Sequence, residues 1–232
     1  ALEGFELGWT QIDLVRNTIA SLGSSATGKT PVTVGAQPDK SIGLVQVAAA
    51  SFDGPGDTTG ENAGVQGSVM SSLVGLHISN IEHNVQAFVA NATLDVDALN
   101  VYALNETNHV ANGKIALNRG TGSTDVWLDG VDLTSSGALA LIAQDLSNYK
   151  ATSEGFSADI PNMDTLKVGI ASTSNTVTRN VSSSIRDSNV SASESVLLAN
   201  STGTLTVTLE SMAFFFFFYY YASTEFYTAD PA

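Results

Sequence analysis

The sequence predicts an all-β chain in which repeated units stack into a β-solenoid, with a short helix near the N-terminus. Two observations support this prediction. A loose repeat recurs three times between Phe88 and Asn200, and from Val32 onward short β-branched runs alternate with Gly, Asn, Asp and Ser. Short strands and frequent turns also suit a β-sandwich, which stays open as the alternative fold.

Three segments share one pattern, and they are the main reason to expect stacking. In each, an aliphatic residue is followed five positions later by a second, then by a small polar stretch and an alternating strand that closes on Ala. The anchors are Val89 and Leu94, Leu128 and Leu133, and Ile185 and Val190, and the closing residues are Ala103, Ala143 and Ala199. The segments start 39 and then 57 residues apart, which suggests two and three units of about 19 residues. A repeat this short cannot bury its own apolar face, so the copies are expected to stack with the anchors in a shared core.

Residues 9–23 are the segment for which a helix is expected. Four aliphatic residues fall on one face at helical spacing: Ile12, Val15, Ile19 and Leu22. Thr10 and Asp13 resemble a capping box, and Gly23 supplies a stop signal.

Strand-like segments follow at Pro31–Val34 and Ser41–Ser51, before a Gly-rich acidic loop at Asp53–Gly64. The resulting division is an N-terminal cap over residues 1–40, repeats over 41–213 and an aromatic tail over 214–232. The tail contains eight consecutive aromatic residues, from Phe214 to Tyr221. Such a run is an aggregation hazard if exposed, so it is expected to pack into a neighbouring subunit or a buried terminal strand.

Charge and composition exclude several classes of partner. Nine Lys and Arg residues stand against 23 Asp and Glu, for a net charge of −14, and this disfavours nucleic acid. There is no Cys, hence no disulfide framework and no thiolate metal site. No stretch reaches the roughly 20 apolar residues of a membrane-spanning helix, so no membrane span is expected.

One segment, from Gly23 to Thr30, matches the phosphate-loop pattern G-x-x-x-x-G-K-[ST]. That loop needs a strand before it and a helix after it, so that backbone N–H groups converge on the phosphates. Here the predicted order is the reverse. We therefore expect a polar loop that does not bind nucleotide.

A calcium site is the one cofactor prediction. Asp53, Asp57 and Glu61 alternate with glycines and offer the hard oxygen ligands that calcium prefers, although their spacing does not fit an EF-hand. Solvated acidic turns are the preferred interpretation, with no cofactor, and calcium is the alternative.

No catalytic constellation is apparent, and the chain is not expected to be an enzyme. His77, His83 and His109 are isolated from one another in the sequence and are expected to be structural or surface residues. Asp125 and Asp129 would share a face of a regular strand, where paired carboxylates could serve a glycosidase or a lyase. An acidic row on a solvated face is the preferred interpretation of these two residues.

The segment from Leu73 to Ser211 resembles the repeats of giant bacterial surface exoproteins, of the filamentous-haemagglutinin type. NVQAFVANATLDVDALNVYALN and NVSSSIRDSNVSASESVLLANSTGTLTV are the pieces that resemble them. The resemblance implies a right-handed parallel β-helix, export to the cell surface and a role as fibre or adhesin. It implies no catalytic residues.

The expected function is therefore that of an extracellular structural or adhesive protein, as a subunit or fragment of a surface filament. Its expected partners are copies of itself, through neighbouring subunits or open solenoid ends, and surface glycans. The alternative, from a different class, is a carbohydrate-active β-helix enzyme, which a cluster of carboxylates and Arg in one cleft would favour.

Overall fold

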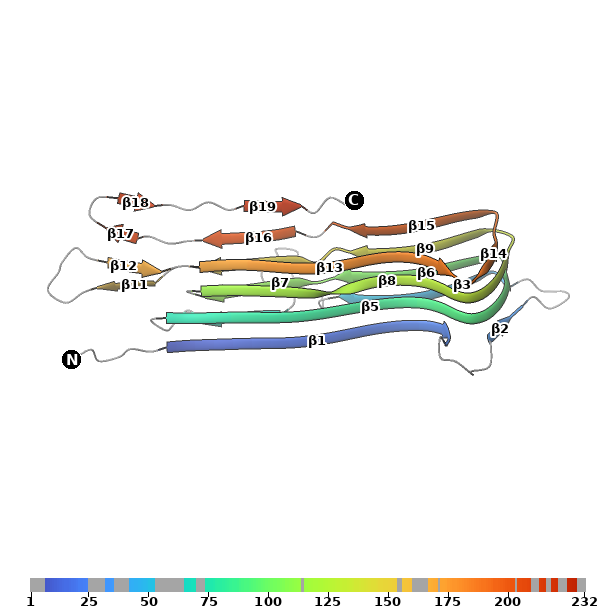
Figure 1. Ribbon diagram of the computed structural model, residues 1–232, viewed down its shortest axis with the longest axis horizontal. Helices are drawn as coiled ribbons and strands as arrows, with labels where there is room; N and C mark the ends of the chain where they lie inside the picture. The colour runs from blue at the N-terminus through green and yellow to red at the C-terminus, as the bar shows by residue number, and fades with distance from the viewer. Residues whose placement is uncertain are drawn as a thin grey trace.

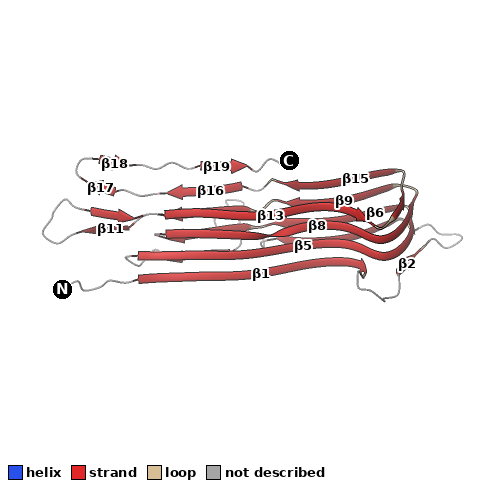
Figure 2. Ribbon diagram, in the orientation of Figure 1, coloured by secondary structure: helices blue, strands red, loops and turns tan. Residues whose placement is uncertain are grey.

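The computed structural model is all-β, and its described residues contain strands and no helix (Figure 2). The structure describes residues 7–24, 32–35, 42–52, 65–69, 74–113, 115–153, 156–159, 167–170, 172–202, 204–209, 213–215, 218–220 and 225–228. It describes the backbone alone at residues 7, 8, 65–69, 74, 75, 156–159, 167–170 and from 204 onward. The all-β part of the predicted fold class is confirmed.

The described strands form four sheets, three of them built mainly of parallel pairs. The front sheet has the order β1-β5-β8-β13, with β2 and β14 added at one end: β1 Leu7–Gly23, β2 Val32–Val34, β5 Val74–Val96, β8 Ile115–Ser135, β13 Ser172–Arg186 and β14 Asn189–Ser191. The back sheet has the order β15-β9-β6-β3: β3 Leu44–Phe52, β6 Ala98–Glu106, β9 Ala138–Asp145 and β15 Glu194–Ser201.

The remaining two sheets lie toward the other end of the molecule. The end sheet has the order β19-β16-β10-β7-β4: β4 Val65–Val69, β7 Asn108–Gly113, β10 Asn148–Ser153, β16 Thr204–Leu209 and β19 Glu225–Thr228. In it only β19 is antiparallel to its neighbour. The hairpin sheet is antiparallel throughout: β11 Phe156–Asp159, β12 Lys167–Ile170, β17 Ala213–Phe215 and β18 Phe218–Tyr220.

The chain visits the front, back and end sheets in the same order again and again, and we call each such passage a tier. The tiers are β1-β2-β3-β4, β5-β6-β7, β8-β9-β10 and β13-β14-β15-β16. In each tier the long front strand bends at one end and the chain returns through the back and end strands, which face the front sheet (Figure 1). Two layers of parallel strands therefore enclose the core.

The strand register confirms the repeat and its core column. Leu94 pairs with Leu133, and Leu133 with Val190, while Val89, Leu128 and Ile185 form a second row of partners. The closing residues Ala103, Ala143 and Ala199 are aligned as well. Leu94, Leu133, Val89 and Leu128 are almost fully buried.

The predicted unit of about 19 residues is wrong. One whole tier separates consecutive copies: Asn84 lies 39 residues before its neighbour Ser123 in the next tier. The interval of 57 residues, seen between Asp125 and Ser182, is also a single tier. It is longer because the segment that contains β11 and β12 is inserted before β13.

A left-handed residue at one corner explains how both anchors of a copy face the core. In a regular strand, residues five apart point to opposite faces. Asn91 has φ 48°, Gly130 has φ 64° and Asp187 has φ 46°. Each lies two residues after the first anchor, and on the two strands with continuous pairing the inward side changes from odd to even positions there or the reverse. Asn, Asp and Gly are the residues that tolerate this conformation best.

The predicted helix over residues 9–23 is wrong. This segment is β1, which pairs in parallel with β5 along its whole length, from Leu7 with Val74 to Gly23 with Ala90. The helical face is split, because Ile12 and Leu22 point toward the core whereas Val15 and Ile19 are 63% and 60% exposed. Pairing with β5 satisfies the backbone along the segment, and this tertiary contact outweighs a weak 3.6-residue pattern.

The main apolar core lies between the front and back sheets. It consists of Val, Leu and Ala side chains, of which Val85, Val89, Leu99, Leu128, Leu139 and Leu141 are fully buried. A smaller cluster of Ala111, Ala116 and Ala151 lies between the front and end sheets. The space between these two apolar regions is polar.

Candidate functional site

Two inward-facing rows of polar residues meet between the apolar regions. On the front sheet, Arg16, His83, Gly122 and Arg179 are consecutive register partners. On the back sheet, the corresponding row is Ser51, Asn105, Asp145 and Ser201. The back row marks the point where each back strand ends and the chain turns into the end sheet. We call these residues, with Thr107, His109, Ser147 and Tyr149, the polar cluster.

An ion pair between Arg179 and Asp145 crosses the interior of the stack. The Nε and Nη2 atoms of Arg179 donate to Asp145 Oδ2 at 2.7 and 2.5 Å. Its Nη1 atom donates to the carbonyl oxygens of His83, at 3.2 Å, and Thr121, at 2.9 Å. The two side chains are only 7% and 2% exposed. Because an unpaired charge at such a depth is costly, this pair ties the fourth tier to the third.

Two glycines of β8 make room for these side chains. A Cβ atom on Gly122 would lie 1.9 Å from the carbonyl oxygen of His83 and 2.9 Å from Arg179 Nη1, and the backbone there has φ +138°. A Cβ atom on Gly120 would lie 2.4 Å from the ring of Tyr149. Neither position can take a side chain without displacing its neighbours.

His83 and His109 come together in the polar cluster although they are distant in the sequence. Their ring centroids are 5.1 Å apart at 75°, and the ring of Tyr149 lies 4.7 Å from that of His109. Both histidines are fully buried. Burial lowers the pKa of His83 to about 4, helped by the positive charges of Arg16 and Arg179. Burial likewise lowers the pKa of His109 to about 3, with His83, Arg179 and Arg16 as further causes.

The ring nitrogens of this pair are poorly satisfied. His109 Nε2 lies 3.1 Å from Thr107 Oγ1, whereas His109 Nδ1 and both nitrogens of His83 have no hydrogen-bond partner within the described part of the chain. Asn105 lies near enough to raise the pKa of His83 slightly, but not in good hydrogen-bonding geometry. Because the pKa values of both histidines are lowered to about 4 and about 3, both rings are neutral near pH 7. They occupy the space beside the charged side chains of the cluster.

A chain of hydrogen bonds connects the carboxylate of Asp145 to His109. Asn105 Nδ2 donates to Ser147 Oγ at 2.8 Å and lies 3.3 Å from Asp145 Oδ2. Ser147 Oγ is 3.0 Å from Thr107 Oγ1, which in turn contacts His109. The backbone N–H of Ser147 donates to Asp145 Oδ1 at 3.0 Å. Ser, His and Asp are all present here, and their hydrogen bonds join the ends of the back strands to the turns that lead into the end sheet.

The outer surface of the front sheet carries a different arrangement, which is open to solvent. A groove of about 360 Å³ crosses β1, β5, β8 and β13 and is lined by Gln11, Ile78, Asn80, Leu117, Asn118, Arg119, Ser174 and Thr176. A smaller hollow of about 170 Å³ adjoins it, since Asn80 and Arg119 line both, and adds Asp13, Glu82 and Thr121. We call the two together the outer groove.

Side-chain amides hold the acidic groups of the outer groove. Asn80 Nδ2 donates to Asp13 Oδ1 at 2.8 Å, and Gln11 Nε2 donates to Asp13 Oδ2 at 2.7 Å. Asn84 Nδ2 donates to Glu82 Oε1 at 2.8 Å. Arg119 of β8 is the register partner of Asn80, and its side chain has no hydrogen bond or ion pair to any described residue. The groove thus presents carboxylates, amides and the guanidinium group of Arg119 beside the aliphatic side chains of Ile78 and Leu117.

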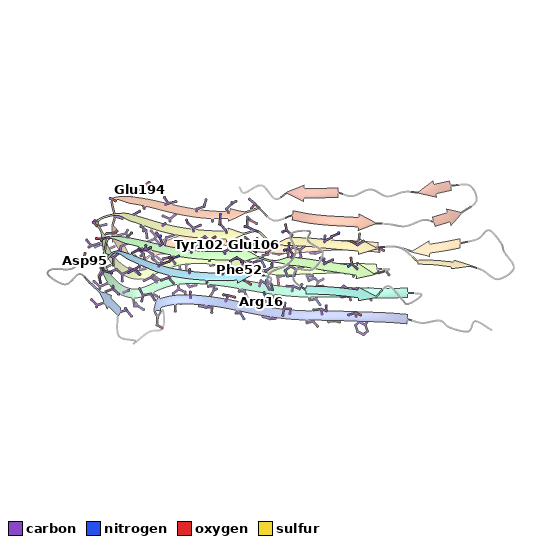
Figure 3. All side chains as sticks on the ribbon, turned by 180° about the vertical axis from the view of Figure 1, so that it is seen from behind. Arg16, Phe52, Asp95, Tyr102, Glu106 and Glu194 are labelled. Atoms are coloured by element: carbon purple, nitrogen blue, oxygen red, sulfur yellow. The ribbon has the colours of Figure 1, made fainter. Side chains whose placement is uncertain are left out.

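Farther along the same outer face, Phe88 of β5 stacks on Trp127 of β8, with ring centroids 4.5 Å apart and an interplanar angle of 7°. The opposite face of the molecule is shown in Figure 3, where Phe52, Tyr102 and Glu106 lie on the back sheet. There Tyr102 donates to Gln144 Oε1 at 3.0 Å, and burial, with Glu106 as a second cause, raises the pKa of the Tyr102 phenol.

The other sequence-predicted site residues are not assembled into a site. The calcium ligands Asp53, Asp57 and Glu61 lie outside the described residues, and so does most of the phosphate-loop match beyond Ser24. The structure describes no side chain of the aromatic tail. Asp125 and Asp129 do share the outer face of β8, where Asp125 accepts a hydrogen bond from Ser182 at 2.6 Å. His77 is fully buried and apart from the other two histidines.

Sequence reasoning missed the polar cluster and the outer groove. A signal for the cluster was present in the repeat itself. The segments His83-Asn84-Val85 and Arg179-Asn180-Val181 align, and strand alternation puts His83 and Arg179 on the same side as the core valines. An ionisable residue at a core position in two tiers indicates a polar interior. The groove had no such signal, because its residues come from four strands.

Comparisons with family models, curated proteins and solved structures find no match for this chain. Among the described residues, no group of three or more His, Asp or Glu side chains is arranged to hold a metal ion. The described part of the chain also contains no helix long and apolar enough to cross a membrane.

Proposed function

We propose that this chain is a right-handed β-solenoid that acts outside the cell as a structural or adhesive protein, within or as part of a surface filament. Each tier would add about 4.8 Å of height, so that a stack of tiers builds a stiff rod. The work of such a protein is to present a long, regular surface to its surroundings.

The alignment of four tiers in one register is the observation that supports this proposal. The same positions recur as partners on every front strand, from Leu22 through Val89 and Leu128 to Ile185. Stacked parallel strands of this kind depend on their neighbours for burial, and no single tier has a core of its own. The buried ion pair between tiers supports a rigid stack as well.

The strands that bound the stack support self-association. Within the described residues, β1 and β3 have a neighbour on one side only, and so do β13 and β15. Val196, Leu197 and Leu198 of β15 are 41–47% exposed. An unpaired strand edge with exposed apolar side chains is a template for another strand. Another copy of the chain, surface glycans and the aromatic tail are the partners we propose for these and other surfaces.

Electron microscopy of the purified chain tests the proposal. We expect rods or filaments whose diffraction shows the strand spacing of about 4.8 Å along the long axis. Introducing Lys at the exposed edge, as Leu197→Lys, should shorten or abolish them, because charged edges block strand pairing. Gln86→Lys, which adds the same charge on β5, an interior strand of the front sheet, is the matched control and should leave the filaments unchanged. Particles that stay single at all concentrations would contradict self-association.

A second candidate function is favoured by one observation. Asp13 and Glu82, with Arg119, line one hollow of the outer groove, as a carbohydrate-active enzyme would require. Incubation with plant and bacterial polysaccharides, followed by detection of reducing ends or unsaturated products, tests this candidate. Products that appear with the unmodified chain and disappear with both Asp13→Asn and Glu82→Gln would favour the enzyme.

A further inference from the structure

We propose that the outer groove binds a segment of an uncharged polysaccharide. This inference rests on the adhesive role proposed above and specifies the chemistry of the ligand. It concerns the outer face of the front sheet, which the groove crosses from β1 to β13.

The groove combines an aliphatic strip with polar side chains around it. Ile78 and Leu117 are register partners on β5 and β8, and they lie next to one another on the outer face. Asn80 and Arg119 are the next outward pair along the same strands. Gln11 borders the strip on β1, while Ser174 and Thr176 border it on β13. Along β5 and β8, the apolar pair Ile78 and Leu117 is therefore followed, two residues later, by the polar pair Asn80 and Arg119.

This pattern matches the chemistry of a sugar ring. A pyranose has an apolar face of C–H groups, which packs on aliphatic side chains, and a rim of hydroxyl groups that both donate and accept hydrogen bonds. Amides, carboxylates and guanidinium groups can each contact two neighbouring hydroxyls at once. A few convergent polar groups beside an apolar surface are what fixes a ligand's orientation in a binding site.

The polar side chains are already held in place, except for one. Asp13 is fixed by Gln11 and Asn80, and Glu82 by Asn84, so little side-chain freedom would be lost on binding. Arg119 has no described partner and offers its donors to the groove. A hydroxyl-rich ligand would satisfy both the acceptors of the carboxylates and the donors of Arg119.

The negative charge of the chain and of the groove favours an uncharged polysaccharide over an acidic one. The chain has a net charge of −14, and the outer groove itself holds two carboxylates against one guanidinium. A polyanion would be repelled both at long range and in the groove. Length favours a polymer, because the groove extends along β1 from Gln11 to Val15, about 13 Å at the rise of a strand. That distance exceeds a single sugar unit.

Calorimetric titration with four hexasaccharides tests the proposal. Cellohexaose, xylohexaose and maltohexaose are the uncharged probes, and hexagalacturonic acid is the acidic one. We expect at least one uncharged probe to bind more tightly than the acidic probe. Asn80→Ala and Arg119→Gln should each weaken that binding about fivefold or more, as expected for lost hydrogen bonds.

Two variants on the same sheet serve as matched controls. Gln86 lies on β5 and faces outward like Asn80, but it lies beyond the groove, and Arg186 is an exposed arginine at the end of β13. Gln86→Ala and Arg186→Gln should leave affinity unchanged. Binding that falls equally in all four variants would overturn the assignment of the groove.

Two other results would overturn the proposal: no heat of binding for any uncharged probe at millimolar concentration, or tighter binding of hexagalacturonic acid. Filament formation is measured separately. Filaments without glycan binding would reject this inference and leave the proposed structural role standing. Glycan binding by particles that stay single would support this inference and reject the proposed filament.

Discussion

At the scale of single residues, Asp145 holds the interior of the stack together. Its carboxylate accepts hydrogen bonds from Nε and Nη2 of Arg179 and from the backbone N–H of Ser147. It also lies 3.4 Å from Thr124 Oγ1. These groups come from β13, β8 and the turn between the back and end sheets. One buried anion thus connects the front sheet to the bend on the opposite side.

Replacing that anion should be strongly destabilising. Asp145→Asn keeps the shape of the side chain but leaves Arg179 buried without a countercharge, so we expect the free energy of unfolding to fall by about 3 kcal/mol or more. Chemical denaturation followed by circular dichroism measures it. Asp125→Asn, which alters a carboxylate on the outer face of the front sheet, is the matched control and should cost less than about 1 kcal/mol. Equal losses in the two variants would show that the ion pair contributes nothing special.

The buried histidines should make the fold sensitive to acid. At pH values well above 6.5, the ordinary pKa of histidine, they are neutral in both states, so they give no pH dependence there. As the pH falls from 6.5 toward 4, the unfolded chain binds protons at His83 and His109 that the folded chain cannot take up, because their folded pKa values are about 4 and about 3. The free energy of unfolding should therefore fall with falling pH across this window, and burial lowers the pKa of His77 to the same effect.

Comparison with a variant separates the contribution of His83 to this pH dependence from that of the other ionisable groups. His83→Gln removes one of the groups, so its free energy of unfolding should decrease less between pH 7 and pH 4.5 than that of the unmodified chain. Denaturant titrations at half-unit pH intervals measure both slopes. Identical slopes would mean that His83 is protonated equally well in the two states.

At the scale of elements, the corner of each front strand depends on one left-handed residue. Asn91, Gly130 and Asp187 take this place in successive tiers and allow the strand to turn its other side to the core. Asn91 also donates from Nδ2 to the carbonyl oxygen of Ser24 in the tier before it. The corner residues of successive tiers therefore share one backbone conformation, a positive φ.

A β-branched residue should not be tolerated in that column. Asp187 is exposed and not crowded, so its substitutions test the backbone alone. Asp187→Val should lower the free energy of unfolding by about 1–2 kcal/mol, the cost of the left-handed conformation for such a residue. Asp187→Gly should leave it nearly unchanged, since Gly adopts positive φ without strain. A valine variant as stable as the glycine variant would refute the requirement, and thermal unfolding of both decides it.

Which elements could be predicted depended on how far apart their stabilising partners lie. The strands of the repeat could be predicted because each copy carries its own anchors and turn residues, and Val32–Val34 and Leu44–Phe52 were evident from their β-branched and alternating sequences. β1 could not, because Val15 and Ile19 face outward and its strand is defined by pairing with a segment 67 residues away. The outer groove needed the register of four strands, which no local pattern contains.

At the scale of the whole molecule, the tiers behave as one unit with an addition at the side. Between the second and third tiers a single residue, at position 114, joins β7 to β8, whereas the connection from β10 to β13 runs over residues 154–171. β13 nevertheless pairs with β8 without a break, from Ser172 with Ile115 to Arg186 with Asp129. The hairpin of β11 and β12 within the longer connection pairs with β17, outside the three parallel sheets.

The stack should therefore survive removal of that connection. We expect a chain in which residues 154–171 are replaced by one lysine, as at position 114, to keep its far-ultraviolet circular dichroism per residue. Its free energy of unfolding should change by no more than about 2 kcal/mol, because loop closure depends only weakly on length. Deleting Thr121 alone from β8 is the control. That change should unfold the chain, since a slip of one residue sends every later side chain of the strand to the opposite face. If the shortened chain unfolds and the Thr121 deletion folds, the tier is not the unit on which this molecule is built.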